Sequence, residues 1–202
     1  MKIICIGRNY AKHAVEMKAA LPSEPVFFMK PDTALNRQNY LYIPDFTSDL
    51  HYEVELVVKI SKVGKHIDEK YAHKYYQEIG LGIDFTARDL QSKCKEKSLP
   101  WEIAKSFDNS ATISTHFIKK EDLDMGNIAF SLQKNGHTVQ EGNEADMIFK
   151  IDQIIAYVSQ FITLKIGDLI YTGTPEGVGP VTINDSLTGF IGEEKMFSIA
   201  IK

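Results

Sequence analysis

The sequence is poor in the features that mark secreted and membrane-spanning proteins. It has only two cysteines, Cys5 and Cys94, which argues against a disulfide framework and favours a reducing compartment. No apolar run approaches the length of a membrane span, and the apolar stretch after the first methionine is too short for a signal-peptide core. We therefore expect a cytoplasmic protein that does not associate with membranes.

Basic stripes, repeats and low-complexity tracts are also missing. The formal net charge is -4 and is spread over both halves of the chain, so nucleic acid is not expected as a partner. No Pro/Ser-rich linker divides the 202 residues, a length that suits one well-buried domain. We predict a single catalytic domain over residues 1–202.

What the sequence does contain is a series of short apolar runs separated by turn signals. Strands are expected over 2–6, 26–29, 41–43, 52–60, 80–86, 130–132, 138–140, 169–171 and 196–201. Helices are expected over 10–21, 69–77, 87–97 and 152–161. Asn9 is the expected cap of the first helix, Thr86 and Asp89 form an expected capping box, and Asn135-Gly136 predicts a hairpin turn. Without regular strand-helix alternation, this pattern predicts an α+β fold that is mainly β, with mixed or antiparallel sheets.

Two carboxylates stand on one face of the strand expected over 52–60. Side chains alternate along a strand, so Glu53 and Glu55 project the same way, with Cα atoms about 7 Å apart. Asp84, near the end of another apolar run, offers a third carboxylate, and His51 could be a fourth ligand but is more often an exposed or supporting residue. Neighbouring carboxylates are tolerated when solvated, when sharing a proton or when binding Mg²⁺, Mn²⁺ or Ca²⁺. The spacing alone leaves these alternatives open.

A histidine and a glutamate lie three residues apart on the first predicted helix. His13 and Glu16 are therefore neighbours on its surface. A carboxylate beside an imidazole raises its basicity and fixes its tautomer, which suits a general base acting on water. A solvated surface pair has the same spacing, so both interpretations remain.

Further polar side chains stand where a bound anion could meet them. Arg88 and Gln91 are three apart on one predicted helix, and Lys105 is flanked by apolar residues. The glycines of loop 172–180 would let backbone N–H groups and the Thr174 hydroxyl approach an anion, although the loop lacks the spacing of a phosphate-binding motif. Solvent-exposed or simple turn positions explain these residues equally well.

Taken in order, these motifs resemble the fumarylacetoacetate hydrolase family, in particular its short single-domain members. The matching stretches are 7–10 (GRNY), 13–16 (HAVE), 28–31 (FMKP), 52–56 (YEVEL), 84–89 (DFTARD), 104–108 (AKSFD), 172–175 (TGTP) and 177–179 (GVG). They run almost from end to end of the chain. The resemblance implies a mixed β-sandwich roll of the family's C-terminal domain type, with a few peripheral helices, in a homodimer.

The resemblance also implies roles for the candidate residues. Glu53, Glu55 and Asp84 would bind one Mg²⁺ or Mn²⁺, with Ca²⁺ possible. The implied catalytic residues are His13 and Glu16, on a lid helix, and Lys105. The implied substrate-binding residues are Arg8, Arg88, Gln91 and Thr174.

The implied activity is cleavage of a C–C bond in a small 2-oxo acid, by acylpyruvate hydrolysis or oxaloacetate decarboxylation. A cation would stabilise the pyruvate enolate in either route. The alternative within the family is isomerisation or tautomerisation of the 2-hydroxyhepta-2,4-diene-1,7-dioate type, and a third is a binding module without catalysis. Glu176 places a negative charge in the glycine-rich loop, where some relatives carry lysine, and could change which distal group is tolerated.

Overall fold

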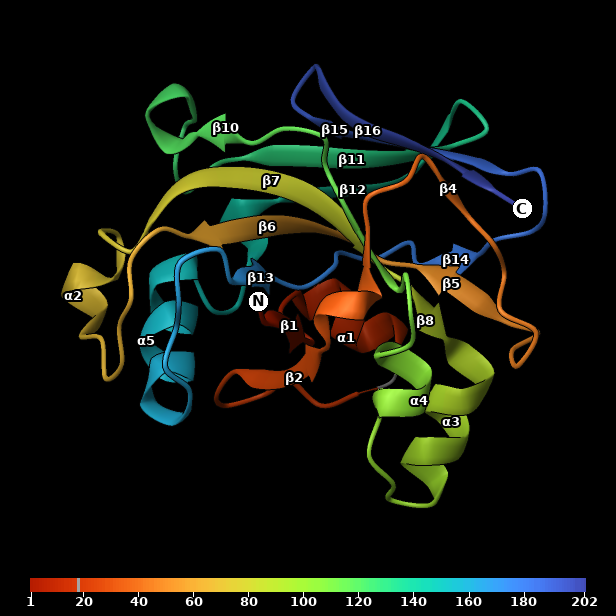
Figure 1. Ribbon diagram of the computed structural model, residues 1–202, viewed down its shortest axis with the longest axis horizontal. Coiled ribbons are helices and arrows are strands. Elements are labelled where there is room, and N and C mark those ends of the chain that lie inside the picture. Colours follow the sequence, from red (N-terminus) through yellow and green to blue (C-terminus); the bar gives the residue numbers. More distant parts are fainter. Residues whose placement is uncertain (18) are drawn as a thin grey trace.

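The computed structural model describes residues 1–17 and 19–202, and in it the chain folds into three β-sheets with short helices at their edges (Figure 1). The largest sheet has eight strands of mixed direction. In hydrogen-bonded order its strands are β2 (Val26–Lys30), β1 (Ile3–Gly7), β13 (Leu169–Tyr171), β6 (Val54–Ile60), β7 (Tyr76–Asp84), β9 (Ala111–Ile113) and β3 (Leu35–Asn36), with β10 (Ile118–Lys119) paired to β7. Residues from both ends of the sequence therefore meet in one sheet, because β1 pairs in parallel with β13.

Two smaller sheets complete the β-structure. The five-stranded sheet consists of β12 (His137–Asn143), β11 (Ala129–Lys134), β15 (Ser186–Ile191), β16 (Glu194–Ile201) and β4 (Tyr40–Leu41). The three-stranded sheet consists of β14 (Gly179–Pro180), β5 (Leu50–Tyr52) and β8 (Thr86–Ala87). The predicted hairpin is confirmed: β11 and β12 are joined at Asn135 and Gly136, whose φ angles of 54° and 81° suit the turn that matches strand twist.

The main core lies between the largest sheet and the five-stranded sheet. Along β6 the alternate residues Val54, Leu56 and Val58 are fully buried, as the alternating pattern predicts. They belong to one apolar cluster with Leu132 of β11 and Ile199 of β16. This packing fixes which face of β6 points away from the core and thus where its carboxylates project.

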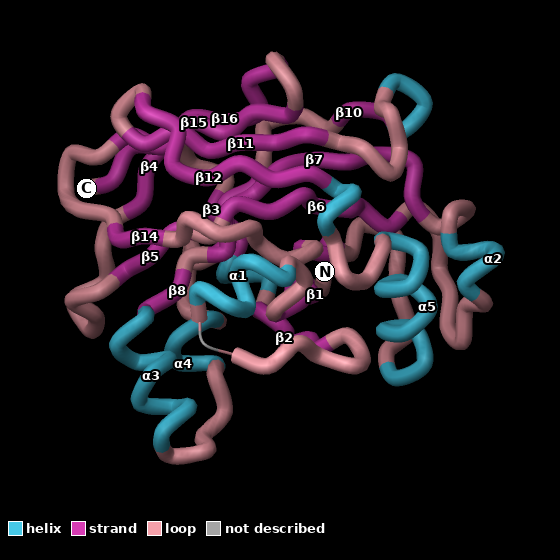
Figure 2. Tube along the Cα trace, turned by 180° about the vertical axis from the view of Figure 1, so that it is seen from behind, coloured by secondary structure: helices cyan, strands magenta, loops and turns pink. Residues whose placement is uncertain are grey.

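Helices are few and lie at the periphery. They are α1 (Ala11–Glu16), α2 (Glu69–Ala72), α3 (Arg88–Glu96), α4 (Glu102–Lys105) and α5 (Ile151–Phe161), with 3₁₀ turns at Asp32–Ala34, Lys120–Asp122 and Glu144–Asp146. Figures 1 and 2 show α3 and α4 together at one end of the molecule and α2 and α5 at the other. Among the described residues, no helix is both long and apolar enough to cross a membrane. The prediction of a mainly β fold with a few peripheral helices is confirmed.

The first predicted helix is wrong in its length and its cap. The helix ends at Glu16 rather than at residue 21, and residue 18 lies outside the described part of the chain. Tyr10, not Asn9, is the N-cap. The Asn9 side chain instead donates to the carbonyl oxygens of Phe149 (3.0 Å) and Thr172 (2.8 Å), so long-range contacts override the local capping preference.

Two other local predictions need correction. The helix predicted over 69–77 ends at Ala72, because Tyr76 is buried and begins β7. The predicted capping box is absent: Ala87 is the N-cap of α3, and Asp89 instead accepts a hydrogen bond from the Thr47 hydroxyl at 2.7 Å. In both places tertiary packing outweighs local preference.

Candidate active site

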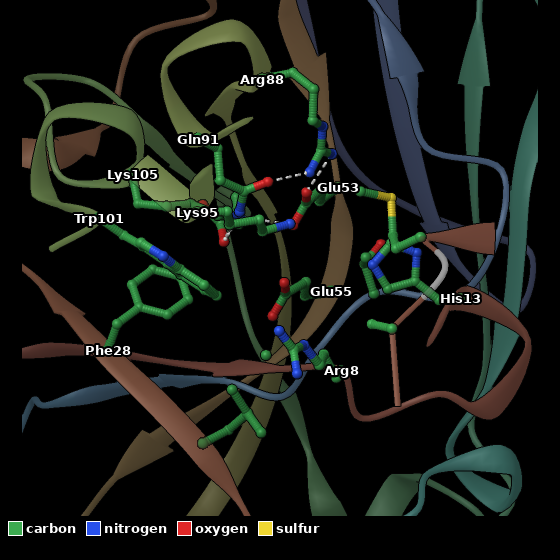
Figure 3. A pocket seen from close by; sticks show the side chains of 16 residues that line it. Arg8, His13, Phe28, Glu53, Glu55, Arg88, Gln91, Lys95, Trp101 and Lys105 are labelled. Carbon is green, nitrogen blue, oxygen red and sulfur yellow. Dashed lines mark hydrogen bonds and ion pairs between the residues drawn. The ribbon is translucent and has the colours of Figure 1, made fainter. Parts of the chain in front are cut away.

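The predicted site residues converge on one pocket between β6, α1 and the α3–α4 pair (Figure 3). Those that line it are Arg8, His13, Glu53, Glu55, Asp84, Arg88, Gln91, Lys105 and Thr174. Glu16 contacts the pocket through His13. The sheet order accounts for this convergence, because β6 lies between β7 and β13 and so brings the middle and the end of the sequence together.

Three carboxylates form the floor of the pocket. Glu53, Glu55 and Asp84 are all buried, and each offers an oxygen within 4.8 Å of the others. Glu53 lies at a break between β5 and β6, so the strand predicted over 52–60 is interrupted there. The Asp84 N–H donates to the Glu53 carbonyl at 2.8 Å, and this bond fixes Asp84 beside the two glutamates.

Two basic side chains pair with the carboxylate of Glu53. Glu53 accepts hydrogen bonds from Arg88 Nη2 at 2.6 Å and from Lys105 Nζ at 2.8 Å (Figure 3). Burial raises the pKa of Glu53, but the charges of Lys105 and Arg88 outweigh it and hold this pKa well below its usual range. Lys105 also donates to Asp84 at 2.7 Å. Burial lowers the pKa of Lys105, whereas Asp84 and Glu53 raise it by more, so the ammonium stays charged.

Glu55 differs from the other two carboxylates. Its hydrogen bond is to the Gly173 N–H at 2.7 Å, and no ion pair reaches it from the described residues. Burial and the charges of Asp84 and Glu53 raise its pKa well above the usual range. A set of buried, mutually repelling oxygen donors fits a hard divalent cation, and it does not fit zinc, which prefers nitrogen and sulfur.

Gly173 is required by the way its backbone approaches Glu55. Its φ of 101° lies in the left-handed region, and a Cβ there would lie 2.7 Å from the Asn9 side chain. Glycine therefore lets the N–H of loop 172–180 reach the buried carboxylate.

The His13–Glu16 pair closes one side of the pocket from α1. His13 Nδ1 lies 3.0 Å from Glu16 Oε2, and His13 is only 7% exposed, so it is not a solvated surface residue. The other Glu16 oxygen accepts from the Gly177 N–H at 3.1 Å, and Lys12 lies 3.3 Å from Glu176. These contacts fasten α1 to the glycine-rich loop.

The remaining predicted residues have ordered partners. Arg88 Nη1 donates to Gln91 Oε1 at 2.8 Å, and the Gln140 amide donates to the Thr174 hydroxyl at 2.9 Å. His51 is not part of the carboxylate cluster, since its Nε2 lies 2.8 Å from Asp49. His51 therefore lies beside the site, as expected for a supporting residue and not for a fourth ligand.

Sequence reasoning assigned no role to Lys30, which the structure buries next to the cluster. Lys30 is 1% exposed, and its ammonium forms an ion pair with Asp84 Oδ1 at 2.8 Å. The ammonium also donates to the Lys105 carbonyl and, at 3.0 Å, to the Ser110 hydroxyl. The one signal in the sequence was its place in the FMKP stretch, which by itself carries no chemistry.

One aromatic wall of the pocket was also missed. Phe28 and Trp101 pack edge to face with centroids 6.1 Å apart. Lys105 Nζ lies 5.3 Å from the Phe28 ring, and Lys95 Nζ lies 5.6 Å from the Trp101 ring. Because Trp101 is also the N-cap of α4, it positions the helix that carries Lys105.

Comparison with known proteins gives consistent matches over nearly the whole chain. The family model described as Fumarylacetoacetate (FAA) hydrolase C-terminal matches residues 2–198. The chain is 46% identical over 186 residues to Oxaloacetate tautomerase FAHD1, mitochondrial, of Bos taurus, covering 92% of this chain and 84% of that protein. It is 42% identical over 207 residues to Oxaloacetate decarboxylase, mitochondrial, of Dictyostelium discoideum, covering 100% of this chain and 94% of that protein.

A solved structure is similarly close. Fumarylpyruvate hydrolase from Pseudomonas aeruginosa, solved with Mn²⁺ and pyruvate, superimposes with a TM-score of 0.93 at 36% identity. The match covers 100% of this chain and 89% of that one.

Proposed function

The chain belongs to the fumarylacetoacetate hydrolase family, and we propose that it is a divalent-cation-dependent enzyme that acts on small 2-oxo acids, with oxaloacetate as the first candidate substrate. One observation carries the proposal: three buried carboxylates share a pocket whose other polar walls are mainly basic. A divalent cation and an anionic substrate together satisfy such a pocket. The names of the relatives agree, since two act on oxaloacetate and a third was solved with Mn²⁺ and pyruvate.

Glu53, Glu55 and Asp84 are the residues that would hold Mg²⁺ or Mn²⁺, and Ca²⁺ could use the same oxygens. When bound, the cation supplies a Lewis acid that polarises the keto oxygen and stabilises the negative charge of an enolate. Lys105 donates hydrogen bonds to Glu53 and Asp84 and adds positive charge beside the substrate.

Three further side chains would bind the substrate from α3 and the glycine-rich loop: Arg88, Gln91 and Thr174. Arg88 has its guanidinium fixed by Glu53 and Gln91, so it presents a fixed charge. The Thr174 hydroxyl is held by Gln140 and can approach a carboxylate oxygen.

His13 is the best-placed proton acceptor. Glu16 is a hydrogen-bond acceptor, so the bond between them places the ring proton on Nδ1 and leaves Nε2 as the basic atom. Glu16 is itself held by Gly177, which keeps the imidazole oriented. A base in this position could take a proton from C3 of the substrate or from an attacking water.

Three reactions are compatible with this arrangement. Tautomerisation moves a proton between C3 and the keto oxygen, decarboxylation releases CO₂ from C4, and hydrolysis adds water to a distal acyl carbonyl. All three pass through an enol or enolate at the same carbons. We favour oxaloacetate tautomerisation or decarboxylation over acylpyruvate hydrolysis because of the names of the two curated relatives.

The test is to measure three reactions with Mg²⁺ and with Mn²⁺: loss of enol absorbance from oxaloacetate, CO₂ release from oxaloacetate, and pyruvate release from acetylpyruvate. The variants are Glu53→Ala, His13→Ala and, as a control on the same helix as His13, Val15→Ala, whose side chain is exposed and outside the pocket. Glu53→Ala should abolish metal-dependent turnover. His13→Ala should slow proton transfer or hydrolysis by about 10²- to 10⁴-fold, and it should affect decarboxylation less, because that step needs no base.

If none of the three reactions is metal-dependent, the proposed function is wrong. If only hydrolysis proceeds, oxaloacetate is the wrong substrate and the acylpyruvate hydrolase alternative replaces it.

We also propose a homodimer and a cytoplasmic location, from the sequence analysis. Size-exclusion chromatography with light scattering tests the first, and a mass of one chain would contradict it. Fractionation of the source cells tests the second, which matters because the two curated relatives carry the word mitochondrial in their names.

A further inference from the structure

Two basic side chains of the pocket have no acidic partner. Arg8 and Lys95 both line the pocket, yet no carboxylate among the described residues forms an ion pair with either. The other basic side chains at the cluster each form an ion pair with a carboxylate: Lys105 and Arg88 with Glu53, and Lys30 with Asp84. Arg8 and Lys95 are therefore available to a charged group of a ligand.

Lys95 lines the pocket next to one ring of an aromatic pair. It is exposed and extends from α3, and its ammonium lies 5.6 Å from the Trp101 ring, which packs on Phe28. Phe28 in turn lies 5.3 Å from the Lys105 ammonium. Each ring thus has a lysine beside it: Lys105, the inner lysine, pairs with the carboxylate cluster, and Lys95, the outer lysine, forms no ion pair with it (Figure 3).

The charges around Lys95 favour an anion. Although the residue is exposed, contact with the pocket wall removes part of the hydration of its ammonium, and this desolvation, followed by the positive charges of Arg88 and Arg8, lowers the pKa of Lys95 below its ordinary value. A nearby carboxylate would relieve this repulsion between cations. The φ of Arg8 is 61°, in the left-handed region, so the backbone turns sharply where this residue enters the pocket between β1 and α1.

We propose that Lys95, with Arg8 near it, binds the second carboxylate of a dicarboxylic 2-oxo acid, an assignment that rests on the function proposed above. The first carboxylate and the keto oxygen belong at the Glu53–Glu55–Asp84 cluster, and the distal carboxylate belongs at the outer lysine. Lys95 is then the residue that distinguishes dicarboxylates such as oxaloacetate from acids whose distal group is neutral.

The test compares two unreactive ligands by calorimetry with Mg²⁺ present. L-Malate and L-lactate share a 2-hydroxy acid head, and only malate carries the distal carboxylate. Oxalate, which has no distal group, reports on the cation site alone. The variants are Lys95→Met, Lys95→Arg to keep the charge, and Lys93→Met, which removes the same charge from an exposed position on the same helix.

We expect wild-type protein to prefer malate over lactate, and Lys95→Met to reduce that preference about tenfold, since a charge-assisted contact is lost. Lys95→Arg should restore most of it, and Lys93→Met should match wild type. If wild-type protein binds oxalate but Lys95→Met leaves the ratio of malate to lactate affinity unchanged, the assignment of Lys95 is overturned and the proposed function stands. If wild-type protein fails to bind oxalate with Mg²⁺, the proposed function is overturned, and this assignment with it.

Discussion

Lys30 is a buried lysine whose partner, Asp84, is known only from the folded structure. Its buried ammonium pairs with Asp84 and donates to Ser110. Removing one partner of a buried ion pair costs about 3–5 kcal/mol, and the lower end applies here because Lys105 still pairs with Asp84. We predict that Lys30→Met lowers the free energy of unfolding of the metal-free protein by about 3 kcal/mol, measured by urea denaturation.

Lys59→Met is the matched control for Lys30→Met. The Lys59 ammonium lies at the same 2.8 Å from a carboxylate, that of Glu78, but both of these side chains are partly exposed, by 45% and 38%. Exposed pairs contribute less than about 1 kcal/mol. Equal losses in the two variants would contradict the role given to burial.

Glu55 should matter for the cation and not for the fold. Its carboxylate is buried beside Asp84 and Glu53, and in the described part of the chain its one hydrogen-bond donor is the Gly173 N–H, so ionising it in the metal-free protein is costly. We predict that Glu55→Gln weakens Mn²⁺ binding at least about 100-fold, since outer-shell changes alone cost about 10- to 100-fold. The metal-free variant should unfold at the same or a higher urea concentration than wild type.

The Mn²⁺ titration of Glu55→Gln can be followed by electron paramagnetic resonance. Glu78→Gln, on the neighbouring strand β7, serves as control and should bind Mn²⁺ like wild type. Unchanged affinity in Glu55→Gln would remove Glu55 from the ligand set.

The sequence predicted the burial or role of a residue only where that property depends on its near neighbours in the chain. The alternation of β6 correctly placed Val54, Leu56 and Val58 in the core, because burial on one strand face is a local pattern. Lys30 pairs with Asp84, which is 54 positions along the chain, and Lys95 lies beside Trp101, which is 6 positions along. Neither contact can be read from the sequence, where a lysine is expected to be exposed.

At the scale of elements, Asp185 connects the segment before β15 to the β11–β12 hairpin. It accepts hydrogen bonds from the Thr182 N–H and the Asn135 amide, both at 2.7 Å, and lies 3.1 Å from Lys134 Nζ. Burial raises the pKa of this carboxyl, but the hydrogen bonds outweigh it and lower the pKa to about 2. In the unfolded chain an aspartate has a pKa of about 3.9.

A folded pKa below the unfolded one means that Asp185 stabilises the protein above about pH 4. This stabilisation is lost as the pH falls from about 4 toward 2. We predict that Asp185→Asn makes the unfolding free energy less dependent on pH in this window, by about 1–2 kcal/mol in total. Urea denaturation at several pH values measures it, and Asp45→Asn, at an exposed position, should keep the wild-type slope.

Elements defined by local chemistry were predicted, and those set by tertiary contacts were not. The Asn135-Gly136 hairpin and the amphipathic helix α5 follow from turn chemistry and apolar spacing. Asn9 and Asp89 carry good capping side chains, but each is used to join distant segments instead. The strand β15 was not predicted.

At the scale of the whole molecule, the pocket exists because of the order of strands. Loop 172–180 reaches Glu55 only because β13 lies between β1 and β6, a pairing that joins segments more than 100 residues apart. Spacing along the chain contains no information on such pairing. Residue spacing alone left the role of each motif open. The resemblance to a known family over almost the whole chain is what predicted that these motifs form one site.

A cation held by three buried carboxylates should stabilise the entire fold, because the unfolded chain has no preformed site. Binding at 100 times the dissociation constant adds about 2.7 kcal/mol, and 1 kcal/mol raises the Tm of a chain of this size by about 2–4 °C. We predict that saturating Mn²⁺ raises the Tm of chelator-treated protein by about 5–10 °C, measured by circular dichroism. Glu55→Gln should lose most of this shift and Glu78→Gln should keep it. Equal shifts in all three proteins would mean that Mn²⁺ stabilises the chain from another site, and that the acidic cluster is neutralised by Lys30, Lys105 and Arg88 alone.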